Sequence, residues 1–225
     1  MARKSRDDKF VEERVPAPIR PLTAKQAEYI NAIMTSEMVT VMGPAGTGKT
    51  YVAATIAADL LRARHIHRIV LTRPNVASGR SLGFFPGTLE EKIGPWVVPF
   101  TDVIRQRMGE GAFEVALKKG DIDIVPFEVM RGRTFNNSFI ILDEAQNTTI
   151  PEIKMFLTRL GKDSTTIING DVAQTDLRET SGLSKVIQMA KRHMLPVPVI
   201  EFGVEDIVRS DLCAMWVKAF LKEGL

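Results

Sequence analysis

The sequence contains 225 residues, of which 44% are hydrophobic and 25% are charged, with a formal charge of +3. These values are ordinary for a folded soluble chain and exclude a disordered chain, a collagen-like fibre and a coiled coil. No apolar run approaches the roughly 18 residues of a membrane span, and no signal-peptide core opens the sequence. The single cysteine, Cys213, fits a reducing compartment. We therefore expect a cytoplasmic protein.

The first 21 residues are predicted to form a flexible, solvated tail. Charged residues crowd around Phe10 and Val11, and three prolines between positions 16 and 21 disfavour helix and sheet. An arm that contacts a neighbouring subunit or a nucleic acid is the alternative. From residue 22 to residue 225 we expect a single domain.

Short apolar segments alternate with helical patterns along this domain. Thr23 can cap a helix, and Gln26 can complete a capping box with it. Strands are predicted at 39–42, 69–72, 122–125, 139–142, 165–169 and 197–202, and further helices at 51–64, 150–160, 182–192 and 207–221. This alternation predicts a three-layer α/β fold, in which helices cover both faces of a central, mostly parallel sheet.

Residues 73–119 fit the alternation poorly. They carry Pro74, Pro86, Pro95 and Pro99, and proline disfavours the interiors of helices and of central strands. We therefore predict a loop-rich insertion here rather than a second domain.

A phosphate-loop motif follows the first predicted strand. The pattern G-x-x-x-x-G-K-[ST] is matched by Gly43-Pro44-Ala45-Gly46-Thr47-Gly48-Lys49-Thr50. Glycines let successive N–H groups turn toward phosphate oxygens, and the helix that follows adds the positive end of its dipole. Lys49 would contact the β- and γ-phosphates of ATP, and Thr50 would place its hydroxyl on Mg²⁺. The alternative is a tight strand-to-helix turn without a ligand.

Two acids, Asp143 and Glu144, end the apolar run at 139–142. A buried strand would carry them to the carboxyl edge of the sheet, beside the phosphate loop. We expect Asp143 to hold the magnesium shell and Glu144 to orient the water that attacks the γ-phosphate. The two motifs lie far apart with a strand between them, which favours ATPases with an extra strand between the two motif strands over small-molecule kinases.

A further predicted strand ends in the polar group Asn169-Gly170-Asp171, and Gln174 follows within one turn. A polar side chain here could sense the γ-phosphate and couple its loss to movement. An ordinary turn with Asp171 as a helix cap explains the pattern equally well, so both interpretations stay open.

Taken together, these motifs resemble the PhoH family over nearly the whole chain from about residue 21. The segments that carry the resemblance are the phosphate loop, Leu71-Thr72-Arg73-Pro74, the run from Leu82 to Ile93, Arg131-Gly132-Arg133-Thr134-Phe135, Ile141 to Thr149, and Gly170 to Leu177. The resemblance implies a cytoplasmic ATP-binding protein with a RecA-like P-loop NTPase core, similar to the first motor domain of superfamily 1 helicases.

The helicase likeness implies roles for individual positions. Gln26 lies where helicases keep an adenine-reading glutamine, although a capping role stays open. Gln174 lies where a glutamine senses the γ-phosphate, and Arg73 falls in a segment that lines the nucleic-acid track. Tyr51, directly after the phosphate loop, is grouped with the nucleotide-binding residues.

An arginine finger is expected from a neighbouring subunit, because helicases of this superfamily obtain it from a second motor domain. The resemblance therefore implies a homo-oligomer, a hexameric ring. The candidate arginines are Arg131, Arg133 and Arg209, each of which could equally be a surface ion-pair partner. Around the last one the family's Val-Arg-His-Pro is replaced by Val208-Arg209-Ser210-Asp211.

The expected function is that of a Mg²⁺-dependent ATPase that acts on single-stranded RNA or DNA. Phe84 and Phe85 are candidate stacking platforms for bases. The alternatives are a P-loop kinase of a small molecule or nucleoside and an ATP-gated oligomeric scaffold. Glu144 favours turnover over a scaffold.

Overall fold

A computed structural model of the chain describes residues 16–74, 89–177 and 179–223. Its centre is a six-stranded sheet in which every neighbouring pair of strands is parallel. The strand order is β3-β2-β4-β5-β1-β6. The strands are β1 (Met38–Met42), β2 (Arg68–Thr72), β3 (Ile122–Ile124), β4 (Ser138–Leu142), β5 (Thr165–Gly170) and β6 (Val199–Glu201). The predicted α/β class is confirmed.

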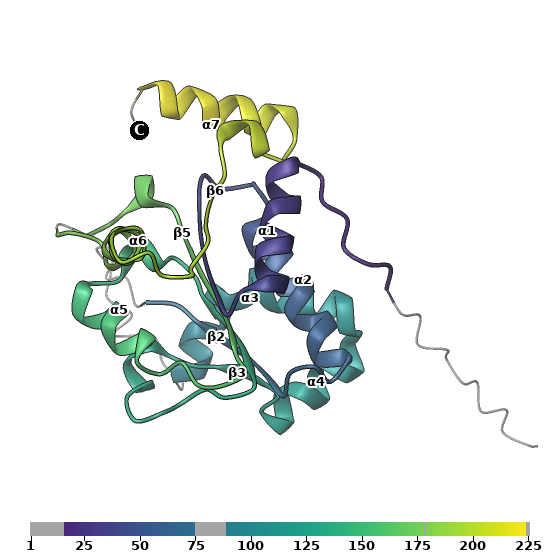
Figure 1. Cartoon of the computed structure of the whole chain (residues 1–225). Coiled ribbons are helices and arrows are strands. Elements are labelled where there is room, and N and C mark those ends of the chain that lie inside the picture. The colour runs from purple at the N-terminus through teal and green to yellow at the C-terminus, as the bar shows by residue number, and fades with distance from the viewer. Residues whose placement is uncertain (1–15, 75–88, 178, 224–225) are drawn as a thin grey trace, which may run out of the picture.

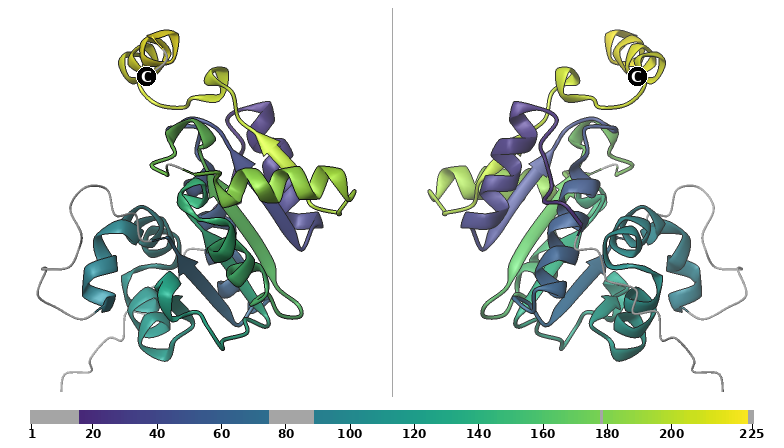
Figure 2. Two further views of the ribbon diagram at one scale, coloured as in Figure 1. Left: turned by 90° about the vertical axis from the view of Figure 1, so that its left-hand side faces the viewer. Right: turned by 90° about the vertical axis from the view of Figure 1, so that its right-hand side faces the viewer.

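Helices cover both faces of this sheet and form the outer two layers (Figures 1 and 2). One layer holds α1 (Ala24–Thr35), α2 (Lys49–Arg62), α3 (Leu89–Met108) and α4 (Glu110–Lys119), and the other holds α5 (Ile150–Leu157) and α6 (Gly182–Arg192). The last helix, α7 (Asp211–Glu223), projects above the carboxyl edge of the sheet. Short 3-10 turns are Phe127–Val129, Ala145–Asn147, Val172–Gln174 and Val204–Asp206.

The alternation of side chains along β4 shows why the sheet is buried on both sides. Phe139 and Ile141 pack into the core under α1 to α4, whereas Ile140 and Leu142 pack into the core under α5 and α6. Successive side chains of a strand point to opposite faces, so a strand covered twice must be apolar throughout. β5 lies between β1 and β4 in the sheet, which confirms the predicted extra strand between the two motif strands.

The predicted loop-rich insertion is wrong for residues 89–119, which form α3 and α4. Proline disfavours a helix interior, yet α3 contains Pro95 and Pro99. Burial outweighs this penalty, because Val97, Phe100 and Ile104 are in the core and α3 packs along α2. The part of the insertion at 75–88, including Phe84 and Phe85, lies outside the described residues.

Three further predictions need correction in detail. The capping box of α1 is only half formed: the Thr23 side chain accepts from the backbone N–H of Gln26, but the Gln26 side chain accepts from Leu22, which precedes the cap. The last helix begins at Asp211 rather than at residue 207. Within the predicted tail, Ile19 packs against the core, whereas residues 1–15 lie outside the described part.

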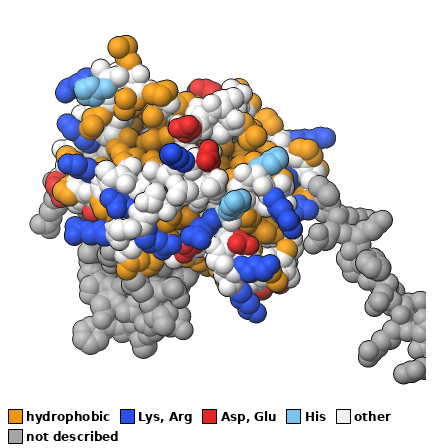
Figure 3. Space-filling model, turned by 60° about the horizontal axis from the view of Figure 1, so that its bottom comes forward, with side chains coloured by type: hydrophobic (Ala, Val, Ile, Leu, Met, Phe, Trp, Pro, Cys, Tyr) orange, Lys and Arg blue, Asp and Glu red, His pale blue; other side chains and the backbone are white. Residues whose placement is uncertain are grey.

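Basic side chains collect at the edge of the sheet where the strands begin. Helices α2, α4, α5 and α6 are among those that end at this edge, and their last turns carry cations, which the negative ends of helix dipoles favour. These cations are Arg62, Lys118, Lys119, Lys154, Lys191 and Arg192. Figure 3, which looks at the bottom of Figure 1, shows Lys and Arg spread over this face. Among the described residues, no helix has the length and apolar character needed to cross a membrane.

Candidate active site

The phosphate loop joins β1 to α2 in a conformation that needs its glycines. Gly43, Gly46 and Gly48 have φ of 136°, 87° and 86°, a region that side-chain-bearing residues rarely adopt. Gly48 is the N-cap of α2 and provides no side-chain hydrogen bond to the first turn. The first N–H groups of α2 therefore lack a side-chain cap, and they lie at the positive end of the helix dipole. An anion fits this position.

Lys49 extends back over the loop that it follows. Its Nζ donates to the carbonyl oxygens of Gly43 at 2.7 Å and Pro44 at 2.9 Å. Burial lowers the pKa of this amine, while the charges of Asp171 and Asp143 act in the opposite direction. The ammonium group thus lies at the centre of the loop, where a phosphate would give it a stronger partner than two carbonyls.

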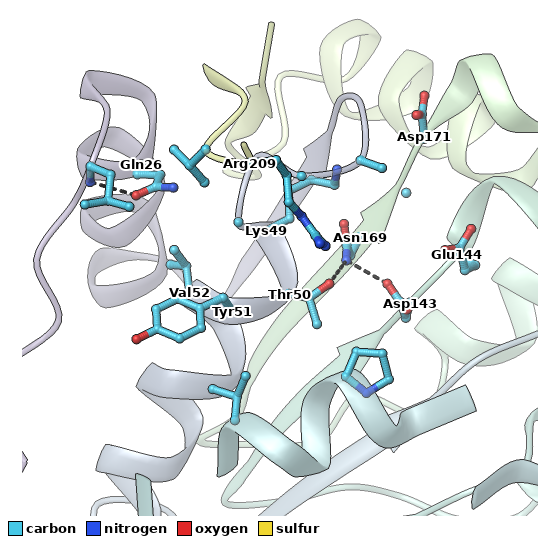
Figure 4. Close-up of a pocket in the computed structure, with 18 of the residues that line it drawn as sticks. Gln26, Lys49, Thr50, Tyr51, Val52, Asp143, Glu144, Asn169, Asp171 and Arg209 are labelled. Carbon is cyan, nitrogen blue, oxygen red and sulfur yellow. Dashed lines mark hydrogen bonds between the residues drawn. The ribbon is translucent and has the colours of Figure 1, made fainter. Parts of the chain in front are cut away.

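Thr50, Asp143 and Asn169 meet at the carboxyl edge of the sheet (Figure 4). Asn169 Nδ2 donates to Asp143 Oδ1 at 2.7 Å and lies 3.5 Å from Thr50 Oγ1. Burial, reinforced by the charge of Glu144, raises the pKa of Asp143 to about 6. A cation bound here would offset both the burial of the Asp143 carboxylate and its repulsion by the charge of Glu144.

The oxygens of this cluster fit Mg²⁺, which prefers hard oxygen ligands and keeps waters or phosphate oxygens in its shell. Thr50 offers a hydroxyl and Asp143 a carboxylate, while the buried Asn169 Oδ1 has no hydrogen-bond partner. Among the described residues, no group of three His, Cys, Asp or Glu could enclose a metal. The oxygen atoms of these three side chains therefore suit an ion whose other ligands are phosphate oxygens and waters.

Glu144 stands next to this cluster in a backbone conformation that residues other than glycine seldom adopt, with φ of 51°. Its Oε2 accepts a 2.6 Å hydrogen bond from Gln146 Nε2. Its Oε1 lies 3.9 Å from an Arg73 nitrogen, which makes a weak ion pair. One carboxylate oxygen is thus held by Gln146 and the other faces Arg73, which leaves Glu144 placed to hold a water.

Gln146 connects this carboxylate to the segment after β5. The side chain is 1% exposed. Its Oε1 accepts from the backbone N–H of Asp171 at 3.0 Å, and its Nε2 also lies 3.4 Å from the Gln174 carbonyl oxygen. Asn147 adds a second link, because its Oδ1 accepts from the backbone N–H of Asp176. A change at Glu144 can therefore reach the loop that carries Gln174.

One cavity of about 690 Å³, a volume in the range of small-molecule and cofactor sites, is lined by Lys49, Thr50, Asp143, Glu144 and Asn169. The phosphate loop, Asp143, Glu144, Asn169 and Gln174 lie at one end. The other residues lining it include Ile19, Leu22, Gln26, Tyr51, Pro99 and Val103. The cavity is thus polar at the phosphate loop and more apolar elsewhere, as a nucleotide requires.

Gln26 lies in this cavity and is 3% exposed. Its Oε1 accepts from Leu22 N at 2.8 Å, and its Nε2 donates to the Thr47 carbonyl oxygen at 3.0 Å. An amide oxygen has two lone pairs and an amide nitrogen two hydrogens. Gln26 therefore joins α1 to the phosphate loop and keeps one acceptor and one donor for a ligand.

Comparison with known proteins agrees with this architecture. Residues 18–221 match the PhoH family, described as PhoH-like protein. The chain belongs to the PhoH family. It is 44% identical over 208 residues to a PhoH-like protein of Bacillus subtilis, covering 92% of this chain and 65% of that protein. It is 41% identical over 224 residues to Protein PhoH of Escherichia coli K12, covering 98% of this chain and 61% of that protein. The chain thus spans less than two thirds of either relative.

Among solved structures, the Pif1 helicase from Candida albicans matches with a TM-score of 0.40 and 16% identity, over 82% of this chain and 41% of that one. Family membership and the phosphate-loop architecture make the chain a P-loop NTPase of the PhoH type. Proteins of this class use a nucleotide and Mg²⁺ in general.

The three arginines expected to act across a subunit boundary have different surroundings in this PhoH chain. Arg209 lines the cavity of its own chain. Arg133 forms an ion pair with Asp123 and lies over the ring of Phe135. Arg131 is exposed. Neither Arg131 nor Arg133 lines this cavity.

Sequence reasoning missed Gln146 and did not assign Asn169 to the site, although it kept open a phosphate-sensing role for a polar side chain at the end of this strand. Asn169 is the last residue but one of β5 and lies in register with Val41 of β1, which places its amide between the two motif strands. The polar end of an otherwise apolar strand was the available signal. No local pattern indicates Gln146, because its partners follow a different strand.

Proposed function

We propose that this PhoH-type chain is a Mg²⁺-dependent ATPase whose cycle acts on single-stranded RNA or DNA. The observation that carries the proposal is the meeting of Thr50, Asp143 and Asn169 beside the phosphate loop, with Glu144 oriented next to them. This arrangement supplies a place for the phosphates, a place for the cation and a group for the attacking water.

The phosphates of ATP would lie over the amino end of α2. Lys49 would exchange its two loop carbonyls for β- and γ-phosphate oxygens. Thr50 and Asp143 would hold Mg²⁺, and the bound ion would offset the charge on the phosphate oxygens. Asn169, which donates to Asp143, would keep that carboxylate turned toward the cation.

Glu144 would position the water that attacks the γ-phosphorus. Its carboxylate would accept a hydrogen bond from the water and align one lone pair with the bond that breaks. Gln146 donates a hydrogen bond to one oxygen of this carboxylate and so fixes its orientation. The new phosphate would then leave past Gln174, which lines the same end of the cavity.

The base would occupy the other end of the cavity, near Gln26 and Tyr51. The remaining donor and acceptor of the Gln26 amide match the N7 acceptor and the N6 donor of adenine. The bond from Gln26 to Thr47 would also relay base binding to the phosphate loop. This pairing supports ATP over GTP, whose base presents a carbonyl where adenine has an amine.

Action on a nucleic acid is proposed from the PhoH resemblance and from the position of Arg73. This arginine follows β2, lines the nucleotide cavity and lies 3.9 Å from Glu144. A nucleic acid that contacts the same segment could therefore influence the catalytic carboxylate. We further propose a ring of identical subunits, in which the exposed Arg131 is available to a neighbouring site.

Release of phosphate from ATP tests the proposal. We expect Mg²⁺-dependent release by the native chain, stimulated by single-stranded RNA or DNA and abolished in Lys49→Ala. Arg192→Ala, which removes an exposed cation at the end of α6, is the matched control and should keep full activity. Phosphate that appears on a small molecule instead would identify a kinase, and ATP binding without any transfer would identify a scaffold.

A further inference from the structure

We infer that Arg209 binds the terminal phosphate of ATP within its own chain and thereby couples the nucleotide to the position of α7. The inference rests on the proposed ATP site and adds a regulated element to it. It concerns the segment 207–210, between the 3-10 turn Val204–Asp206 and α7.

The segment is attached directly to the phosphate loop. The backbone N–H of Val208 donates to the Gly46 carbonyl oxygen at 2.9 Å. A Cβ added to Gly46 would lie 2.7 Å from Arg209 Cγ, so the arginine stem packs against this glycine. The loop that would hold the phosphates and the segment that carries Arg209 therefore form one packed unit.

The guanidinium of Arg209 reaches into the nucleotide cavity. Figure 4 shows its side chain extending from above the phosphate loop toward Thr50 and Asn169. Arg209 lines the cavity together with Lys49, Asp143 and these two residues. A planar guanidinium on this side can form two parallel hydrogen bonds with phosphate oxygens. Because it approaches the cation end of the cavity, its partner is the γ-phosphate, which ADP lacks.

The connection from Arg209 to α7 is short and ordered. Ser210 Oγ accepts from the backbone N–H of Cys213 at 3.4 Å, which caps the first turn of α7. Asp211 adds a negative charge at the amino end of this helix, where the dipole favours it. The helix thus begins two residues after the arginine, and a displacement of Arg209 is transmitted to it without a flexible linker.

The helix has room to move. A largely apolar cavity of about 550 Å³, whose lining also includes Asp171, Gln174 and Glu201, separates α7 from the back of the phosphate loop. Gly43, Pro44 and Phe202 line it on the core side, and Val217 and Phe220 line it on the α7 side. On the side of α7 that lines the cavity, Phe220 is 50% exposed. Movement of α7 into this cavity would remove apolar surface from water.

The switch therefore follows from these contacts. The γ-phosphate holds Arg209 in the nucleotide cavity, where Figure 4 shows it, and the short connection keeps α7 in the projecting position of Figures 1 and 2. Hydrolysis and phosphate release remove the partner of Arg209, and α7 then moves onto the apolar cavity behind the loop. The occupant of the apolar cavity is α7 itself.

The single cysteine provides the probe. Cys213 is exposed and lies in the first turn of α7, so an environment-sensitive fluorophore attached to it reports the position of this helix. Glu144→Gln keeps ATP intact during the measurement. In that background we expect an emission change with ATP and Mg²⁺, none with ADP, and none with either nucleotide when Arg209 is also replaced by alanine.

Binding measurements separate this inference from the proposed function. Arg209→Ala should weaken ATP binding by about ten-fold to a hundred-fold, the range for a lost charge-assisted hydrogen bond, and leave ADP binding within about two-fold. Arg209→Lys should restore part of the ATP affinity, and Arg192→Ala should change neither. Equal emission changes with ATP and ADP, or an unchanged ATP affinity in Arg209→Ala, would overturn the inference alone. Failure of the native chain to bind ATP would overturn the ATPase proposal.

Discussion

Replacement of Asp143 by asparagine should stabilise the folded chain while it abolishes magnesium-dependent turnover. Burial and the neighbouring charge of Glu144 raise the pKa of Asp143 from an ordinary 3.8 to about 6. The folded state therefore binds this proton more tightly than the unfolded state. Between about pH 4 and pH 6, a rising pH lowers the free energy of unfolding, and the loss is complete above pH 6.

The size of this effect follows from the pKa difference. One pKa unit corresponds to about 1.36 kcal/mol, so the shift limits the destabilisation at pH 7.5 to about 3 kcal/mol. Solvent reaches part of the side chain, which reduces the value. We expect Asp143→Asn to raise the free energy of unfolding by about 1–3 kcal/mol at pH 7.5, and by roughly half as much at pH 5.

Urea unfolding in the presence of EDTA, without nucleotide, measures this difference. Asp163→Asn is the matched control, because Asp163 is exposed and has a φ of 55°, which asparagine also tolerates. It should change stability by less than about 0.5 kcal/mol. An Asp143→Asn variant that is no more stable than the native chain at pH 7.5, or whose gain is equal at both pH values, would refute the reasoning.

Three further substitutions test other parts of the structure. Gln146→Ala removes the hydrogen bond that orients Glu144, so we expect a kcat at least about ten-fold lower with a nearly unchanged Kd for ATP. Equal losses of turnover and of affinity for ATP would contradict a positioning role. Gly46→Ala should weaken nucleotide binding, measured by titration, far more than Gly120→Ala, because only the first meets another side chain. Phe139→Ala should lower the free energy of unfolding by about 3–5 kcal/mol in a denaturant titration, and a loss under 1 kcal/mol would contradict full burial in the core.

Much of this fold could be predicted because its strands are buried on both faces. Such strands are continuous apolar runs, as in 139–142, and their limits were predicted to within one or two residues at β1, β2, β4 and β5. The prediction for β6 was three residues too long, because only Val199–Glu201 of the predicted run at 197–202 pair in the sheet. Helix α3 was missed because its prolines oppose helix formation locally, whereas its packing on α2 becomes visible only in three dimensions.

The residues of the candidate site also fall into two groups, those that local sequence could predict and those that it could not. Residues within one motif, such as Lys49 and Asp143, were predicted because their chemistry depends on local order along the chain. Residues that act across motifs were missed or placed differently. Arg209 was expected to act on a neighbouring subunit, yet it lines its own cavity, because Val208 anchors its segment to the phosphate loop. No spacing in the sequence indicates such a contact.

The most direct test of the ATPase proposal is single-turnover hydrolysis of ATP by the native chain and by Glu144→Gln. The substitution keeps the size of the side chain but removes the charge that would orient the water. Our account predicts a similar Kd for ATP and Mg²⁺ and a hydrolysis rate lower by about a hundred-fold or more, as for the loss of a catalytic base. Equal hydrolysis rates in the two proteins, at equal ATP occupancy, would contradict it.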